Sequence, residues 1–251
     1  MADPPAAGAS PLWRLILVPS VLTLGVTLLR VWGELQQWPT VLFNPAPGGG
    51  AALVGITWLV PVFGAYFALR LARGAVDLQA GRVLAISLLA LGVVFAIHLW
   101  VGTIKREQGS QGILGVFAVS SVLGGLVGLS AWPALGRTLL VYGLAARVPV
   151  ALVSLAAIRG NWMTHYDQPP PGFPYIGNWL AKWLWIGLLP QMTIWVAYTV
   201  IVGAIAGGLA LLVAGQRAAP PRPVTPVRRP PTGAPPRPAL RPPPGRVMPP
   251  R

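Results

Sequence analysis

The chain has 251 residues, of which 54% are hydrophobic and only 10% are charged, whereas soluble domains usually carry about a quarter charged residues. This deficit, together with several apolar runs of about 20 residues, excludes an ordinary soluble domain and predicts an all-α, multi-pass membrane protein. The chain contains no cysteine, which excludes disulfides, thiolate metal sites, iron–sulfur clusters and cysteine nucleophiles.

Six apolar stretches are long enough to cross a bilayer as helices, and together they predict a helical membrane domain over 12–214. Residues 1–11 are expected to form a short disordered N-terminus. The six spans are predicted at 12–32, 51–72, 83–104, 113–132, 136–158 and 188–214.

The stretch 159–187 is the one long segment of this domain that is not predicted to cross the membrane. A continuous helix of the 38 residues from Gly177 to Ala214 would be about 57 Å long, but the hydrocarbon core is only about 30 Å thick. We therefore expect a break at Pro190, preceded by an outer loop and a short helix that lies in the membrane interface. The side chains expected to anchor this interfacial helix are Trp179, Lys182, Trp183 and Ile186.

Lysine and arginine set the expected orientation, because they are enriched in cytoplasmic segments. The tail 217–251 contains eight arginines, 14 prolines and no acid, so we expect a disordered cytoplasmic tail that attracts anionic lipid head groups. With six spans, both termini are then cytoplasmic, and the preference for arginine over lysine suggests a bacterial cytoplasmic membrane. Nucleic acid is not an expected partner of the tail, which has no aromatic residue for stacking on bases.

Arg147 is the most unusual residue, because it falls near the middle of the span 136–158 and no span contains an acid to pair with it. A charge at that depth costs about 2.5–3.5 kcal/mol on insertion scales. Pro149 frees a backbone carbonyl nearby, so one interpretation is an anion or lipid-headgroup site that uses Arg147 or Arg159. The alternatives are that Arg147 snorkels to the interface or that this span is re-entrant.

The two histidines suggest further hypotheses. His98, in the outer half of 83–104, could relay protons or hold a ligand, although one hydrogen bond to a neighbouring helix would explain it equally well. His165 and Asp167 could form a catalytic acid/base pair, or they could belong to a polar cap that holds the outer loop against the bundle. No catalytic motif accompanies them, and no cofactor or metal is expected.

Glycines spaced four residues apart indicate close helix packing, at Gly124 and Gly128 and again at Gly203 and Gly207. These faces could join the protein to a membrane protein partner or to a second copy of itself. The scarcity of polar residues in the spans favours a non-catalytic structural or assembly subunit of a membrane complex. The alternatives are a small transporter or channel that uses Arg147 and His98, and a membrane enzyme that acts on lipid.

Overall fold

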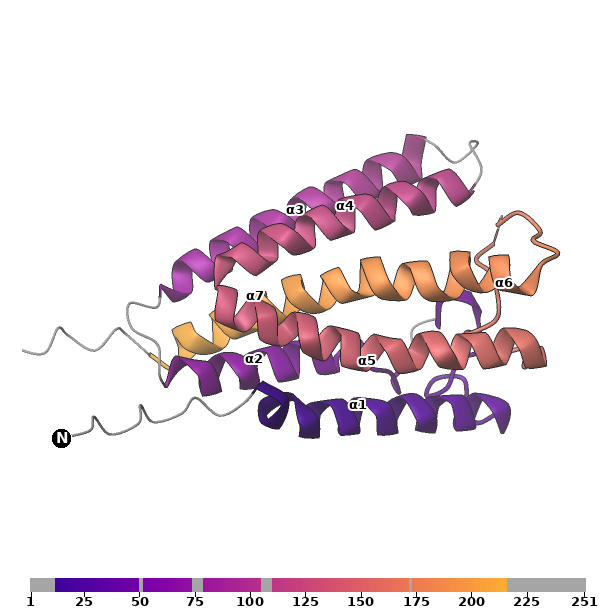
Figure 1. Ribbon diagram of the computed structural model, residues 1–251, viewed down its shortest axis with the longest axis horizontal. Helices are drawn as coiled ribbons and strands as arrows, with labels where there is room; N and C mark the ends of the chain where they lie inside the picture. The colour runs from indigo at the N-terminus through magenta and orange to yellow at the C-terminus, as the bar shows by residue number, and fades with distance from the viewer. Residues whose placement is uncertain (1–11, 50–51, 74–78, 105–109, 172, 216–251) are drawn as a thin grey trace, which may run out of the picture. The chain divides into compact units, whose positions relative to one another are not determined.

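The computed structural model describes residues 12–49, 52–73, 79–104, 110–171 and 173–215, and all regular structure within them is helical (Figure 1). The predicted disordered segments 1–11 and 217–251 lie outside the described residues. The principal helices are α1 (Leu12–Leu35), α2 (Leu59–Ala72), α3 (Ala80–Ile104), α4 (Ser110–Ala131), α5 (Pro133–Gly160) and the long helix Trp179–Val213.

Five helices in the described part of the chain are long and apolar enough to cross a membrane. Large apolar side chains cover their outer faces, and Leu89 and Phe95 of α3, for example, are each 65% exposed, as contact with lipid requires. The chain is therefore a multi-pass membrane protein in contact with the lipid bilayer. The five helices are Leu12–Leu35, Ala80–Thr103, Gly112–Ala131, Pro133–Gly160 and Trp179–Val213.

The second predicted span is wrong in its boundaries, because α2 begins at Leu59 and has only 14 residues. The preceding residues from Ala52 form a loop that lies beside the segment following α1, where the Leu53 N–H donates to the Val41 carbonyl at 3.0 Å. Apolar composition alone predicts a helix here. The segment forms a loop instead, because its backbone N–H groups donate to carbonyls of the segment after α1. Gly55 also lies against the guanidinium of Arg30.

The predicted break at Pro190 and the separate interfacial helix are also wrong. Pro190 keeps helical dihedral angles, φ −62° and ψ −40°, and the chain forms one helix of 35 residues. A proline cannot donate the usual helical hydrogen bond, and wider turns on both sides accommodate this loss without ending the helix. The long helix consists of α6 (Trp179–Lys182), the π-helical turns η2 (Trp183–Leu188) and η3 (Gln191–Trp195), and α7 (Val196–Val213).

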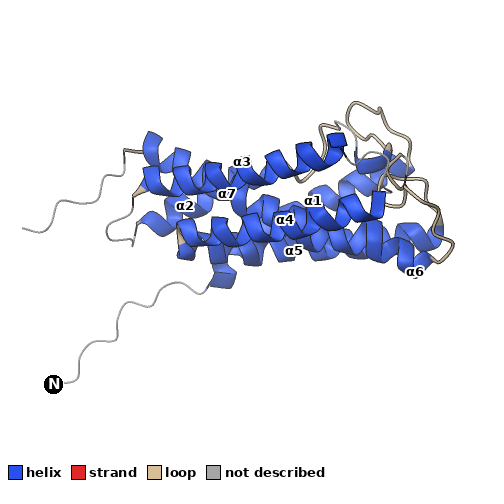
Figure 2. Ribbon diagram, turned by 90° about the horizontal axis from the view of Figure 1, so that it is seen from above, coloured by secondary structure: helices blue, strands red, loops and turns tan. Residues whose placement is uncertain are grey.

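The helix α7 occupies the centre of the bundle, where it packs against α2, α3, α4 and α5. The helix α1 lies along α5 on one side, and the pair α3–α4 lies on the other (Figure 1). Seen from above, all these helices run along one common direction (Figure 2). Tyr142 of α5 is fully buried, with its ring edge-on to Phe63 and Phe67 of α2 at 5.5 and 5.4 Å between centroids. Its hydroxyl shares a 2.8 Å hydrogen bond with Thr23 of α1, so three helices meet at this side chain.

Two pairs of small residues bring α2 and α7 into backbone contact. Gly64 lies directly against the backbone of Gly203, and a Cβ at Gly207 would come 2.8 Å from the Cβ of Ala68. Because the pairing advances by four residues on both helices, α2 and α7 run in the same direction.

Gly124 and Gly128 of α4 lie against the same central helix, and Gly124 lies against Val94 of α3 as well. A Cβ at Gly124 or Gly128 would come 3.4 or 3.3 Å from the Ile201 side chain. These faces, and those of Gly203 and Gly207, therefore pack within the bundle; that they also join the protein to a partner or to a second copy stays a prediction. The bundle itself covers all four positions, as small residues at helix crossings permit.

Candidate functional site

A cavity of about 580 Å³ lies between α1, α4, α5 and the long helix. Loop residues such as Gly49 and His165 line one end, and Arg147 and Trp195 line the other. From α5 the cavity receives Arg147, Val150 and Ser154, whose spacing of three and four residues places them on one helix face. The walls between the two ends are mostly apolar and include Val26, Ile56, Ile113, Phe117, Phe173 and Ile186.

Arg147 brings an unpaired positive charge to the inner end of this cavity. It lies near the middle of the 28-residue α5, so its Cα is about 20 Å from either end of the helix. The residue is 4% exposed, and its guanidinium carbon lies 4.8 Å from the centroid of the Trp195 ring. Its Nε atom is buried without a hydrogen-bond partner, and no acid forms an ion pair with it within the described residues.

Gln191 adds a second unpartnered polar group to the cavity wall. Its side-chain oxygen is buried and accepts no hydrogen bond, and the residue lines the cavity together with Pro190 and Trp195. All three residues lie in or beside the π-helical turn η3. Such turns often occur at functional sites, because they shift side chains off the regular helical positions.

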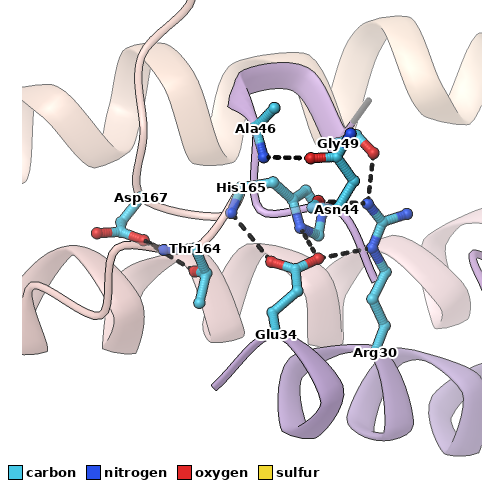
Figure 3. Close-up of polar contacts among 8 residues, drawn as sticks. All are labelled: Arg30, Glu34, Asn44, Ala46, Gly49, Thr164, His165 and Asp167. Carbon is cyan, nitrogen blue, oxygen red and sulfur yellow. Dashed lines mark hydrogen bonds and ion pairs between the residues drawn. The ribbon is translucent and has the colours of Figure 1, made fainter. Parts of the chain in front are cut away.

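A cluster of hydrogen-bonded charged and polar groups lies at the loop end of the cavity (Figure 3), where Arg30, Gly49 and His165 line it. The side chain of Glu34 is fully buried and accepts a hydrogen bond from Arg30 Nε at 2.9 Å, with Arg30 one helical turn earlier on α1. Arg30 also donates to the backbone carbonyls of Asn44 and Gly49, at 3.3 and 2.6 Å. From the loop after α5, His165 donates its backbone N–H to Glu34 at 3.1 Å and places its ring Nδ1 2.5 Å from the same carboxylate.

Burial keeps two titratable side chains at the loop end, His165 and Tyr166, uncharged near pH 7. Burial lowers the pKa of His165, and the hydrogen bond that the ring donates to Glu34 opposes that change only in part. The ring is therefore neutral at pH 7, with its Nδ1 proton donated to the carboxylate. Burial likewise raises the pKa of the neighbouring Tyr166 phenol, so that phenol is also neutral.

The structure does not join His165 and Asp167 as an acid/base pair. Both Asp167 oxygens accept hydrogen bonds from their own turn, from the Met163 N–H at 3.0 Å, the Thr164 N–H at 2.7 Å and the Thr164 hydroxyl at 2.8 Å. Asp167 is 2% exposed and shapes the loop, while His165 bonds to Glu34. The sequence hypothesis of catalysis by this pair therefore lacks the geometry that proton transfer between the two groups would need.

His98 and Arg159 both lie outside the cavity wall. His98 Nε2 is 3.1 Å from the Ser120 hydroxyl, and its ring stacks on Phe117 at 4.1 Å between centroids, so it links α3 to α4. Arg159 is exposed, with its guanidinium 4.5 Å from the centroid of Trp179. The structure thus separates Arg147 from both residues with which the sequence hypotheses associated it.

The four residues expected to anchor an interfacial helix occupy different environments. Trp179 is 42% exposed, and Lys182 is half-buried. Trp183 donates its indole N–H to the Ala151 carbonyl of α5 at 2.8 Å, and Ile186 lines the cavity. Two of the four side chains therefore attach the long helix to the bundle interior.

Sequence reasoning missed the two residues that organise the loop end, Arg30 and Glu34. Their i,i+4 spacing at the end of a span was an available signal, since such a pair on one helix can form an ion pair. No sequence signal would have shown that Glu34 meets His165, 131 positions later. Within the described residues, no three His, Asp or Glu side chains gather as a metal site would require.

Comparison with known proteins adds no family to this description. No protein-family model, no curated protein and no solved structure matches the chain.

Proposed function

We propose that this multi-pass membrane protein binds an organic anion with an apolar body in the cavity between Arg147 and the loop end. The observation that carries the proposal is Arg147 itself, which is 4% exposed, lines the cavity and has no acidic partner in the described chain. An unpaired charge at this depth is costly to insert, and a bound anion would offset that cost.

The shape and composition of the cavity support the same ligand class. Its volume of about 580 Å³ falls within the range of about 300–1,000 Å³ that is usual for small-molecule sites. Mostly apolar walls with a few polar groups, here Arg147, Gln191 and Ser154, suit a ligand with one polar end and an apolar remainder.

A binding function is favoured over catalysis on lipid. His165 donates to Glu34, and Asp167 is occupied by its own turn, so neither has the free acid or base that the enzyme hypothesis needs. The assembly-subunit hypothesis loses the support of its glycine faces, which the bundle covers.

Transport of the same anion is the second candidate function. The specific observation in its favour is that the cavity extends from the loop end to Arg147, near the middle of α5. A carrier needs a site at about that depth, reached in turn from either side. His98 no longer contributes to this hypothesis, because it is bonded to Ser120 outside the cavity.

We further propose that α2, together with the loop before it, is a sixth crossing, and that both termini are cytoplasmic. The parallel direction of α2 and α7 supports this topology, because a helix that runs with the last span ends on the same side as it does. The arginine-rich tail, which lies outside the described residues, would then attract anionic lipid from the cytoplasmic side.

The test is native mass spectrometry of the protein purified from its own membrane in mild detergent. We expect wild type to carry a bound organic anion and Arg147→Gln to lose it. Arg137→Gln, at an exposed position near the start of the same helix, is the matched control and should retain the anion. Wild type without any bound anion, or an anion retained by Arg147→Gln, would contradict the proposal.

A further inference from the structure

The charged groups around the cavity leave one net positive charge, which bears on how many negative charges a ligand can carry. Three residues that can carry a positive charge line the cavity, namely Arg30, Arg147 and His165. Arg30 is neutralised by Glu34, whose carboxylate lies 2.9 Å from its Nε and is fully buried. The remaining Arg30 donors that form hydrogen bonds are directed to the carbonyls of Asn44 and Gly49.

His165 does not add to that charge near neutral pH. The groups around it are Arg30, Glu34, Asp167 and the Tyr166 ring. Its Nδ1 proton is donated to Glu34, and burial holds its pKa below the usual value. Asp167 forms hydrogen bonds only within its own turn.

Arg147 is thus the one uncompensated charge among the described cavity residues. The titratable groups near its guanidinium are three tyrosines, Tyr142, Tyr166 and Tyr198. Phenols are neutral near pH 7, so none of the three compensates the charge of Arg147. Around the guanidinium the surface is aromatic and apolar, with Trp195 on one side and Val150 one turn along α5.

We propose that the cavity selects ligands that carry a single negative charge, such as a carboxylate or a phosphodiester, over the dianion of a phosphate monoester. This inference rests on the proposed function and specifies the ligand of the same site. One guanidinium can pair with one anionic group through parallel hydrogen bonds. A second negative charge would be stripped of water without a counter-charge, which low-dielectric surroundings penalise strongly.

Gln191 offers a way to change the selectivity without touching Arg147. It lines the same cavity, and its side-chain oxygen has no partner, so replacement by lysine removes no hydrogen bond to that oxygen. Gln191→Lys adds a second positive charge to the cavity, which should admit a dianion.

The experiment measures equilibrium binding of three amphiphiles, each with an eight-carbon chain, to the full-length protein in nanodiscs of zwitterionic lipid at pH 8. Octanoate represents a free carboxylate, octyl methyl phosphate represents a lipid-like phosphodiester, and octyl phosphate is a dianion at this pH because its second pKa is about 6. We expect at least one of the two monoanions to bind at least tenfold more tightly than octyl phosphate. Whichever monoanion binds more tightly identifies the natural source as a free acid or a lipid head group. In Gln191→Lys the affinities for the tighter-binding monoanion and for octyl phosphate should differ by less than threefold.

The outcomes separate this inference from the proposed function. Equal binding of monoanions and dianion in wild type, lost in Arg147→Gln, overturns the charge selectivity and leaves the binding function intact. If none of the three probes binds, or if binding is unchanged in Arg147→Gln, both proposals are wrong. Gel filtration of each variant in detergent establishes that it is folded, and Arg137→Gln again serves as the control.

Discussion

Two arginines line opposite ends of one cavity, and their surroundings differ in a way that separates structure from function. Arg30 has a carboxylate at 2.9 Å and two backbone carbonyls within reach. Arg147 is more deeply enclosed than Arg30, at 4% exposure, but faces the ring of Trp195 and has no acid partner among the described residues. Both charges carry a desolvation cost, and only that of Arg30 is offset within the described chain.

The comparison shows that burial alone does not identify a functional charge. Arg30 and His165 both donate hydrogen bonds to Glu34, and Arg30 also donates to loop carbonyls. These bonds join α1 to the loop after it and to the loop after α5. Arg147 forms no ion pair within the described residues, and its guanidinium is therefore available to a ligand. Substitutions at the two ends should have opposite consequences, loss of stability at one and loss of binding at the other.

The largest expected effect is that of Glu34→Gln on stability. The change removes the fully buried carboxylate that accepts hydrogen bonds from Arg30 and from His165, and leaves the largely buried Arg30 without its counter-charge. Breaking a buried ion pair in this way costs about 3–5 kcal/mol, measured as the free energy of unfolding in mixed micelles. Arg137→Gln, which alters an exposed charge, should change stability little. An unchanged stability of Glu34→Gln would show that Arg30 does not depend on this carboxylate.

Arg147→Gln should instead abolish binding while leaving the fold intact. Truncating one partner of a buried charge pair typically costs at least 2 kcal/mol, so we expect octanoate affinity to fall about 100-fold, or about 2.8 kcal/mol. The thermal midpoint without ligand should not fall, because no ion pair within the described chain is broken. A large loss of stability with normal binding would reverse the assignments of the two arginines.

A packing variant away from both arginines provides a reference for the size of these stability changes. In Gly64→Ala the new methyl group would overlap the backbone of Gly203, and overpacking of this kind costs about 1–3 kcal/mol. Gly25→Ala is the matched control, because a Cβ there meets nothing within 4 Å. Equal thermal midpoints for the two variants would contradict the close approach of α2 and α7.

The smallest expected effect is the pH dependence contributed by His165. Its pKa in the folded protein lies below the reference value of 6.5, so the unfolded chain binds the proton more readily. The stability linked to this group is therefore fully present above pH 6.5 and declines as the pH falls through the folded pKa. Thermal melts between pH 8 and pH 5 should show that His165→Gln loses less stability on acidification than wild type. An identical decline in both proteins would show that His165 is not the group that titrates.

The sequence predicts the membrane class and most helices, because apolar runs determine both. It fails at Pro190, where the π-helical turns allow the helix to continue, and at residues 52–58, where an apolar segment forms a loop held by contacts distant in sequence. The choice of Arg147 as the anomalous charge came from the sequence alone, since only the absence of acids was needed. The pairing of Glu34 with His165 could not be predicted, because it depends on how two loops meet in three dimensions.

The most direct test of the anion site is the structure of the protein with 8-bromooctanoate bound, with bromine located by its anomalous scattering. We expect a bromine peak inside the cavity and the carboxylate within hydrogen-bond distance of the Arg147 guanidinium, with both absent in Arg147→Gln. Bromine found only on the lipid-facing surface, with water alone beside Arg147, would contradict it.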